Sequence, residues 1–176
     1  MKKTNLKKLI YSALFLALGI VLPLFTAQIK EIGDTLLPMH LPVMLCGLFC
    51  GGYYGLAVGL MLPFMRSAIF SMPPLYPNAV WMALELAAYG FVLGLLYSKR
   101  KTNKIWYLYF SLITSMVLGR VVWGIAKAVL LGLAGKTFTI SAFVMGGFVD
   151  SLLGIALQLV LIPLIVKITE KIKAER

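Results

Sequence analysis

The sequence predicts an all-α, polytopic integral membrane protein with about six transmembrane helices. Hydrophobic residues make up 61% of the 176 residues and charged residues only 13%, whereas soluble domains are about half apolar and a quarter charged. The mean hydropathy of +0.94 agrees with this class. Because a helix needs about 20 apolar residues to cross a bilayer, the length suffices for about six spans with short connections. Residues 1–176 are therefore expected to form a single transmembrane domain.

The basic residues indicate the topology. Lysine and arginine number 17 against six acidic residues, and most of them lie in three clusters, at positions 2–8, 99–104 and 167–176. Cytoplasmic segments of membrane proteins carry an excess of Lys and Arg. With all three clusters inside, an even number of spans separates them. We expect a multi-pass protein of the cell membrane with both termini cytoplasmic, and the net charge of +11 requires no nucleic-acid partner.

The first three spans are delimited by polar and turn residues. Span 1 covers about Leu6 to Ala27; its lysine-led apolar run is similar to a signal peptide but lacks a small-residue cleavage site, so we expect a retained span. Pro38 and Pro42 bracket the start of a short span 2, which ends at the glycine turn 51–52. Span 3 returns outward from Tyr53 to about Phe70.

The second half of the chain predicts three more spans. Residues 71–78 contain three prolines and cannot form regular helix, so they are expected to be the second external connection. Span 4 runs from about Ala79 to Tyr97. Span 5, from Ile105 to about Ala134, is longer than a bilayer requires and should tilt or protrude outside. Gly135 to Thr139 form the third external connection, and span 6 continues from about Ile140 through Ile168.

Five ionisable residues remain inside the predicted spans. Such residues are costly in lipid, normally face a bundle interior and mark functional sites. At the helical rise per residue they lie about 6 to 21 Å from the external ends of their spans. Similar depth on four spans predicts a pocket open to the outside that binds a small molecule. The five residues are Arg66, Glu85, Arg120, Lys127 and Asp150.

The pairing of these charges leaves alternatives open. Arg120 with Glu85 and Lys127 with Asp150 would leave one cation for an anionic ligand such as a carboxylate. The same residues would alternatively form structural ion pairs that lock helices together, although this explains their matching depth less well.

Further side chains lie beside the predicted pocket. His40 stands at the first external connection, where it either caps the pocket with Met39 or is a simple interface residue. Aromatic residues supply flat apolar walls or form ordinary interfacial belts. The additional candidates for substrate binding are His40, Trp81, Tyr76, Asn78 and Trp123.

The sequence carries no pattern of catalytic or metal-binding residues. It has one histidine, neither H-E-x-x-H nor G-x-S-x-G, and no metal-ligand spacing around its carboxylates. Cys46 and Cys50, the two cysteines, lie four apart on an apolar segment and are expected to be buried rather than bridged. We expect no catalytic residue, no metal and no cofactor.

Two pairs of small residues predict close helix contacts. Ala13 and Ala17 lie on span 1, and Gly55 and Gly59 on span 3. Small residues spaced by four let helix backbones approach closely. One face is expected to bind a partner subunit and the other to pack internally.

The arrangement of spans, the inside termini, the long first external connection and Ala13-x-x-x-Ala17 resemble the S components of energy-coupling factor (ECF) vitamin transporters over the whole chain. The segments LPMHLPVMLCG (37–47) and RSAIFSMPPLYP (66–77) are similar to a subgroup associated with pantothenate uptake. The resemblance implies a subunit that captures a vitamin or related micronutrient outside. Its partners would be a transmembrane coupling subunit, contacted through Ala13 and Ala17, and two ATPase subunits.

The resemblance also assigns energy and gating. The chain has no G-x-x-x-x-G-K-[ST] loop, so ATP hydrolysis would belong to the partners. In the family, external loops act as gates, which here correspond to Gln28–His40 and Ser71–Asn78. The rival classes are a membrane scaffold or cell-shape protein, and an intramembrane enzyme or small channel. A scaffold would not need buried charges that converge beneath external loops.

Overall fold

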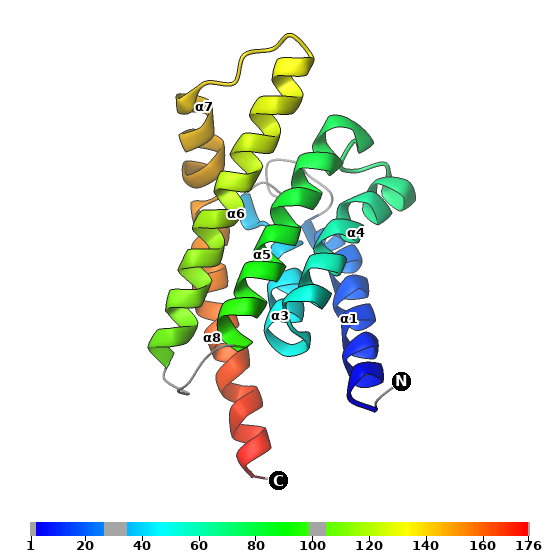
Figure 1. Cartoon of the computed structure of the whole chain (residues 1–176), viewed down its shortest axis with the longest axis vertical. Helices are drawn as coiled ribbons and strands as arrows, with labels where there is room; N and C mark the ends of the chain where they lie inside the picture. The colour runs from blue at the N-terminus through cyan, green and yellow to red at the C-terminus, as the bar shows by residue number, and fades with distance from the viewer. Residues whose placement is uncertain (1–2, 27–34, 99–104, 176) are drawn as a thin grey trace.

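The computed structural model describes residues 3–26, 35–98 and 105–175, which form a bundle of helices (Figure 1). Among these residues, five helices are long and apolar enough to cross a membrane, and two apolar helical segments are shorter. The all-α, polytopic fold predicted from the sequence is confirmed. The elements are α1 (Lys3–Val21), η1 (Leu22–Thr26), α3 (His40–Cys50), α4 (Gly52–Phe70), η2 (Leu75–Ala79), α5 (Val80–Ser98), α6 (Ile105–Leu133), α7 (Ile140–Val144), η3 (Met145–Val149) and α8 (Leu152–Ala174).

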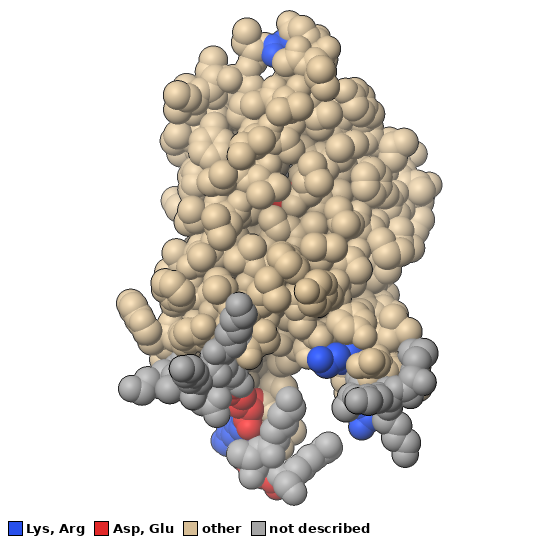
Figure 2. Space-filling view, in the orientation of Figure 1, with Lys and Arg blue, Asp and Glu red and all other residues tan. Residues whose placement is uncertain are grey.

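Both ends of the chain lie at the same end of the bundle, as an even number of crossings requires (Figure 1). On the face shown in Figure 2, charged side chains gather at that end, one basic patch shows at the opposite tip, and the belt between them is almost uncharged. Helix α6 has 29 residues and is therefore about 43 Å long, more than the hydrocarbon thickness. Its far end extends beyond the ends of α4 and α5 (Figure 1), as expected for a span longer than the hydrocarbon thickness.

Helix α3 is too short to cross the hydrocarbon, because its 11 residues span only about 16 Å. The residues before it pack against the bundle: a Cβ atom on Gly154 of α8 would lie 2.6 Å from the carbonyl oxygen of Thr35, and residues 35–38 are partly buried. The last residues of the first predicted connection therefore lie against the helices. Non-helical backbone is tolerated at membrane depth where protein covers it. Residues 27–34 of the same predicted gate lie outside the described residues.

The last predicted span is interrupted, and its prediction as one continuous helix is wrong. Helix α7 ends at Val144, a π-helical turn covers Met145–Val149, and α8 begins at Leu152. Gly146 and Gly147 fall in the turn, and glycine is a weak helix former. Because a π turn adds a residue to the helix, it rotates the side chains that follow it. Asp150 is consequently exposed, and Ser151 is buried in its place.

Glycines set the contact of α4 with α5. A Cβ atom on Gly90 would lie 2.5 Å from the carbonyl oxygen of Gly55, and one on Gly59 would lie 2.5 Å from the backbone nitrogen of Ala87. The Gly55–Gly59 face therefore packs internally, as predicted for one of the two small-residue faces. Ala13 and Ala17 are exposed on α1.

Cys46 and Cys50 are buried and not bridged, in agreement with the sequence prediction.

Candidate functional site

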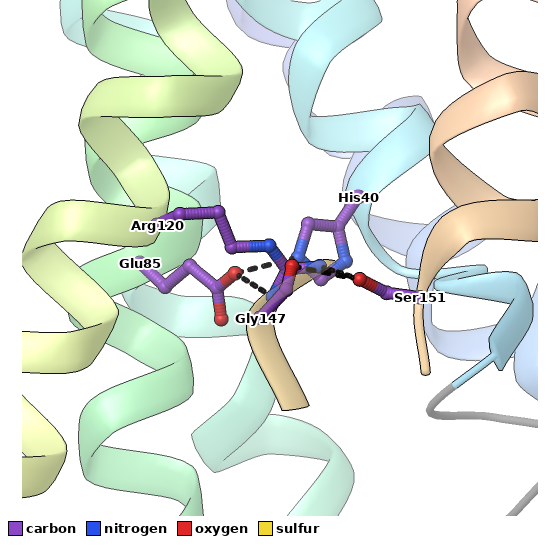
Figure 3. Close-up of polar contacts among 5 residues, drawn as sticks. All are labelled: His40, Glu85, Arg120, Gly147 and Ser151. Carbon is purple, nitrogen blue, oxygen red and sulfur yellow. Dashed lines mark hydrogen bonds and ion pairs between the residues drawn. The ribbon is translucent and has the colours of Figure 1, made fainter. Parts of the chain in front are cut away.

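A buried polar network joins α3, α5, α6 and the break before α8, and its side chains point toward one another (Figure 3). Arg120 Nη1 donates to Glu85 Oε1 at 2.8 Å, and His40 Nε2 lies 3.3 Å from the same oxygen. Arg120 Nη2 donates to Ser151 Oγ at 2.9 Å, and Ser151 in turn donates to the carbonyl oxygen of Gly147 at 2.9 Å. The exposed fractions of His40, Glu85 and Arg120 are 2%, 2% and 3%. The network is thus almost completely shielded from solvent.

Tyr89 supports this network from one turn along α5. The His40 ring meets the Tyr89 ring edge to face, with 5.1 Å between centroids. A Cβ atom on Gly119 would lie 2.8 Å from the Tyr89 ring, so the glycine beside Arg120 makes room for this ring. The residues next to the charged groups therefore bring α3, α5 and α6 close enough for the ion pair to form.

Two polar atoms of the network have no hydrogen-bond partner among the described residues. They are His40 Nδ1 and Arg120 Nε, and both are buried. Buried polar atoms are nearly always paired in native proteins, with protein or with water. A small polar molecule that reaches the network would find these two atoms ready to bond.

An aromatic box stands one to two turns from Arg120 toward the C-terminal end of α6 and surrounds the ammonium group of Lys127. Lys127 Nζ lies 4.5 Å from the ring centroid of Trp123, 5.4 Å from that of Trp81 and 5.3 Å from that of Phe138. Such distances are those of cation–π contacts. The Arg120 guanidinium lies 5.8 Å from the centroid of Trp123. Trp123 therefore belongs to the Lys127 box and also contacts the deep network through Arg120.

The predicted convergence of ionisable residues is confirmed for part of the set. The Arg120–Glu85 pair forms as expected, and Lys127 joins them through Trp123. The pair expected between Lys127 and Asp150 is absent from the ion pairs of the described residues, and Asp150 is exposed. The rotation at the π turn is the physical reason, because it directs Ser151 instead of Asp150 into the network.

Arg66 lies apart from the network, so its expected convergence with the other ionisable residues is wrong. Its Nη1 atom donates to the carbonyl oxygen of Ile20 at 2.7 Å, and its guanidinium lies 5.3 Å from the Phe70 ring centroid. The bond joins α4 to the end of α1, where Pro23 has no N–H to donate. These contacts give Arg66 a structural role.

The other predicted residues divide by burial. His40 lies inside the network and Trp81 inside the box. Tyr76 is 60% exposed in η2, and Asn78 is partly exposed beside it. Their roles in substrate binding stay predictions.

Sequence reasoning missed Ser151 and Phe138. Serines in membrane helices commonly bond a carbonyl one turn back, as Ser151 does with Gly147, so the residue type alone does not single one out. Phe138 falls in a predicted external connection, and no periodicity there indicates where its ring lies.

A groove between α5 and α6 differs from the polar network because its lining is apolar. Its volume is about 320 Å³, and it is lined by apolar side chains such as Val80, Leu84 and Val129. None of the charged candidates lines it, so it does not suit a polar ligand.

The comparison with protein families gives one result. The model of the family described as the substrate-specific component of ECF transporters matches residues 7–166. No curated protein and no solved structure matches the chain significantly. The matched range includes every residue of the network and of the aromatic box.

Proposed function

This chain belongs to the family of ECF transporter substrate-specific components, and from that membership we propose that it captures a vitamin or related micronutrient, with pantothenate as the first candidate. The family consists of transporter subunits and not of enzymes, which agrees with the resemblance noted in the sequence. In this proposal the ligand enters from outside the cell, and a coupling subunit with two ATPase subunits supplies the energy for its delivery. The N and C termini then lie in the cytoplasm.

The observation that supports the proposal is the buried network beneath the Lys127 box. Ionisable groups at membrane depth are costly and persist where they serve a site. The network and the box together contain the cations Arg120 and Lys127 and the Glu85 carboxylate, which is paired with Arg120. They also contain two buried nitrogens that have no hydrogen-bond partner among the described residues. Such groups suit a small molecule that has both a charge and neutral polar groups. We assign substrate binding to His40, Glu85, Arg120, Lys127, Trp81 and Trp123.

The exposed face of α1 supports the proposed partner. Ala13 and Ala17 are exposed on this helix, so another helix can approach its backbone closely. We assign this face to the coupling subunit. The proposed gates are Gln28–His40 and Ser71–Asn78, as the resemblance to the family implies.

The test is ligand-dependent thermal stability of the purified chain in detergent. A ligand that binds only the folded state raises the free energy of unfolding by about 2.7 kcal/mol at 100 times its Kd. We expect a saturable rise in Tm with one compound from a panel of B vitamins and their precursors, pantothenate among them. The absence of any rise, from protein shown to be folded, would contradict the proposal.

Two arginine variants sharpen this test. Arg120→Ala should abolish the ligand-dependent rise, because it removes a group of the network. Arg66→Ala should lower the Tm without ligand but keep most of the rise, because its contacts are with Ile20 and Phe70. Equal ligand responses in wild type and both variants would remove Arg120 from the site.

A further inference from the structure

A second buried arginine, Arg66 on α4, lies apart from the polar network. Its exposed fraction is 3%, the same as that of Arg120. Arg120 is paired with Glu85, whereas none of the ion pairs found among the described residues contains Arg66. A guanidinium remains charged in proteins, and a buried charge without a counter-charge is costly. An anion from outside the described chain would offset this cost.

One edge of the Arg66 guanidinium has unused donors. Nη1 donates to the carbonyl oxygen of Ile20 at 2.7 Å. Nε is buried without a hydrogen-bond partner, and Nη2 has no acceptor among the described residues either. Because Nη2 is not among the enclosed atoms, it is the nitrogen through which the guanidinium meets the surface. Nε and Nη2 share one edge of the planar group, and their parallel N–H bonds match two oxygens of a phosphate.

The surface around this edge is apolar and lies near the ends of two spans. Arg66 is four residues from the end of α4, or about 6 Å along the axis, and Ile20 is one residue from the end of α1. The nearby side chains of Phe25, Phe64 and Ile69 are exposed. Lipid headgroups border the hydrocarbon at the ends of spans, and acyl chains cover apolar side chains there. A phospholipid therefore supplies both the oxyanion and the apolar contacts that this surface suits.

We infer that Arg66 binds the phosphodiester group of an anionic phospholipid, such as phosphatidylglycerol, at the ends of α1 and α4, with Nε and Nη2 as the donors. An anionic headgroup neutralises the guanidinium without bringing a second cation, whereas a zwitterionic headgroup brings an ammonium with it. Basic pockets between membrane helices recognise anionic lipids in this way. The site is separate from the polar network and does not depend on the function proposed for it.

The experiment measures the Tm of the delipidated chain in detergent as phosphatidylglycerol or phosphatidylcholine is added. We expect a saturable rise in wild type, with its midpoint at a lower concentration for phosphatidylglycerol. Arg66→Gln should raise the phosphatidylglycerol midpoint by about tenfold or more and remove this preference, since charge-assisted hydrogen bonds are lost. Lys136→Gln makes the same change in net charge at an exposed position and should keep the wild-type response.

Arg66→Lys gives a second measurement that does not require removal of the buried charge. Lysine keeps the charge but lacks the two parallel donors of the guanidinium edge. Native mass spectrometry of wild type and this variant counts the phosphatidylglycerol that stays bound. We expect the variant to retain less of it than wild type, and equal retention would overturn the assignment of Nε and Nη2 as the donors.

The remaining outcomes identify the source of the anion. Inorganic phosphate and glycerol 3-phosphate without lipid should leave the Tm unchanged, and a rise equal to that with phosphatidylglycerol would overturn the lipid as the source. Equal phosphatidylglycerol midpoints in wild type and Arg66→Gln would overturn the site itself. Loss of co-purification with the coupling subunit in Arg66→Gln, with an unchanged lipid response, would assign the guanidinium to a carboxylate of that subunit and overturn the inference.

Discussion

At the scale of single residues, the Arg120–Glu85 pair is the most consequential contact, because neither charge is accessible to water. Removing one partner of such a pair leaves the other buried and uncompensated, which costs more than the pair contributes. The pair also fixes the relative positions of α5 and α6 at the level of the site. Its integrity should therefore matter for stability as well as for ligand binding.

Glu85→Gln should destabilise the folded chain by on the order of 3 kcal/mol, because the Arg120 charge loses its carboxylate. The measurement is the Tm in detergent without ligand. Glu175→Gln provides the same chemical change at an exposed position and should leave the Tm unchanged. The double variant Glu85→Gln, Arg120→Met should recover part of the loss, and equal stability of wild type and Glu85→Gln would contradict this role.

Counting depth along each helix from the span ends predicts that Glu85 and Arg120 belong to one buried site, but it does not determine which charges pair. The same counting placed Asp150 in the site, but it assumes an uninterrupted helix. The π turn at Met145–Val149 invalidates that assumption and substitutes Ser151. Depth along a helix does not show toward which neighbour a side chain points around the helix axis. The sequence therefore groups Arg66 with the site residues, whereas in the structure its side chain bonds the carbonyl oxygen of Ile20.

At the scale of elements, the glycine contact between α4 and α5 holds the helices that carry Arg66 and Glu85. Gly90 and Gly55 meet backbone to backbone, so no flexible side chain can yield to an added methyl group. Close approach of this kind also allows extensive van der Waals packing, which drives helix association in lipid.

Gly90→Ala should lower stability by about 1–3 kcal/mol, because its methyl group overpacks the contact with Gly55. Gly132→Ala is the matched control, since no atom lies within 4 Å of the added Cβ on α6. Alanine is the better helix former, so the control should keep or raise the Tm. A Gly90→Ala protein as stable as the control would show that α4 and α5 do not depend on this close approach.

Helix α1 is expected to act in assembly more than in ligand binding. Ala13→Leu and Ala17→Leu should leave the Tm of the isolated chain unchanged, because both positions are exposed. The same variants should lose co-purification with the coupling subunit and ATPases, because larger side chains prevent close helix approach. Ala156→Leu, an exposed alanine on α8, is the control. Retained assembly by the α1 variants would exclude this face as the contact.

Most element bounds could be predicted, because apolar run length and glycine or proline punctuation determine them. The exceptions are α3 and the last span. Helix α3 follows partly buried residues that pack against Gly154, a tertiary contact that local sequence does not encode. The break after α7 depends on how Gly146 and Gly147 pack beside Trp123.

At the scale of the whole molecule, the chain combines a buried polar network inside the bundle with an exposed helix face on α1. The network draws on α3, α5, α6 and Ser151 just before α8, whereas the exposed alanines lie on α1. In the proposed function, the first of these serves the ligand and the second serves the coupling subunit. A subunit of this kind selects the substrate and depends on its partners for energy.

The most direct test is ATP-dependent uptake of the ligand found in the thermal panel into proteoliposomes that contain this chain with its coupling subunit and ATPases. Uptake should require both ATP and this chain, and it should fall in Arg120→Ala while ATPase subunits remain bound. Uptake that proceeds equally without this chain, or that does not respond to ATP, would contradict its role as the substrate-specific component.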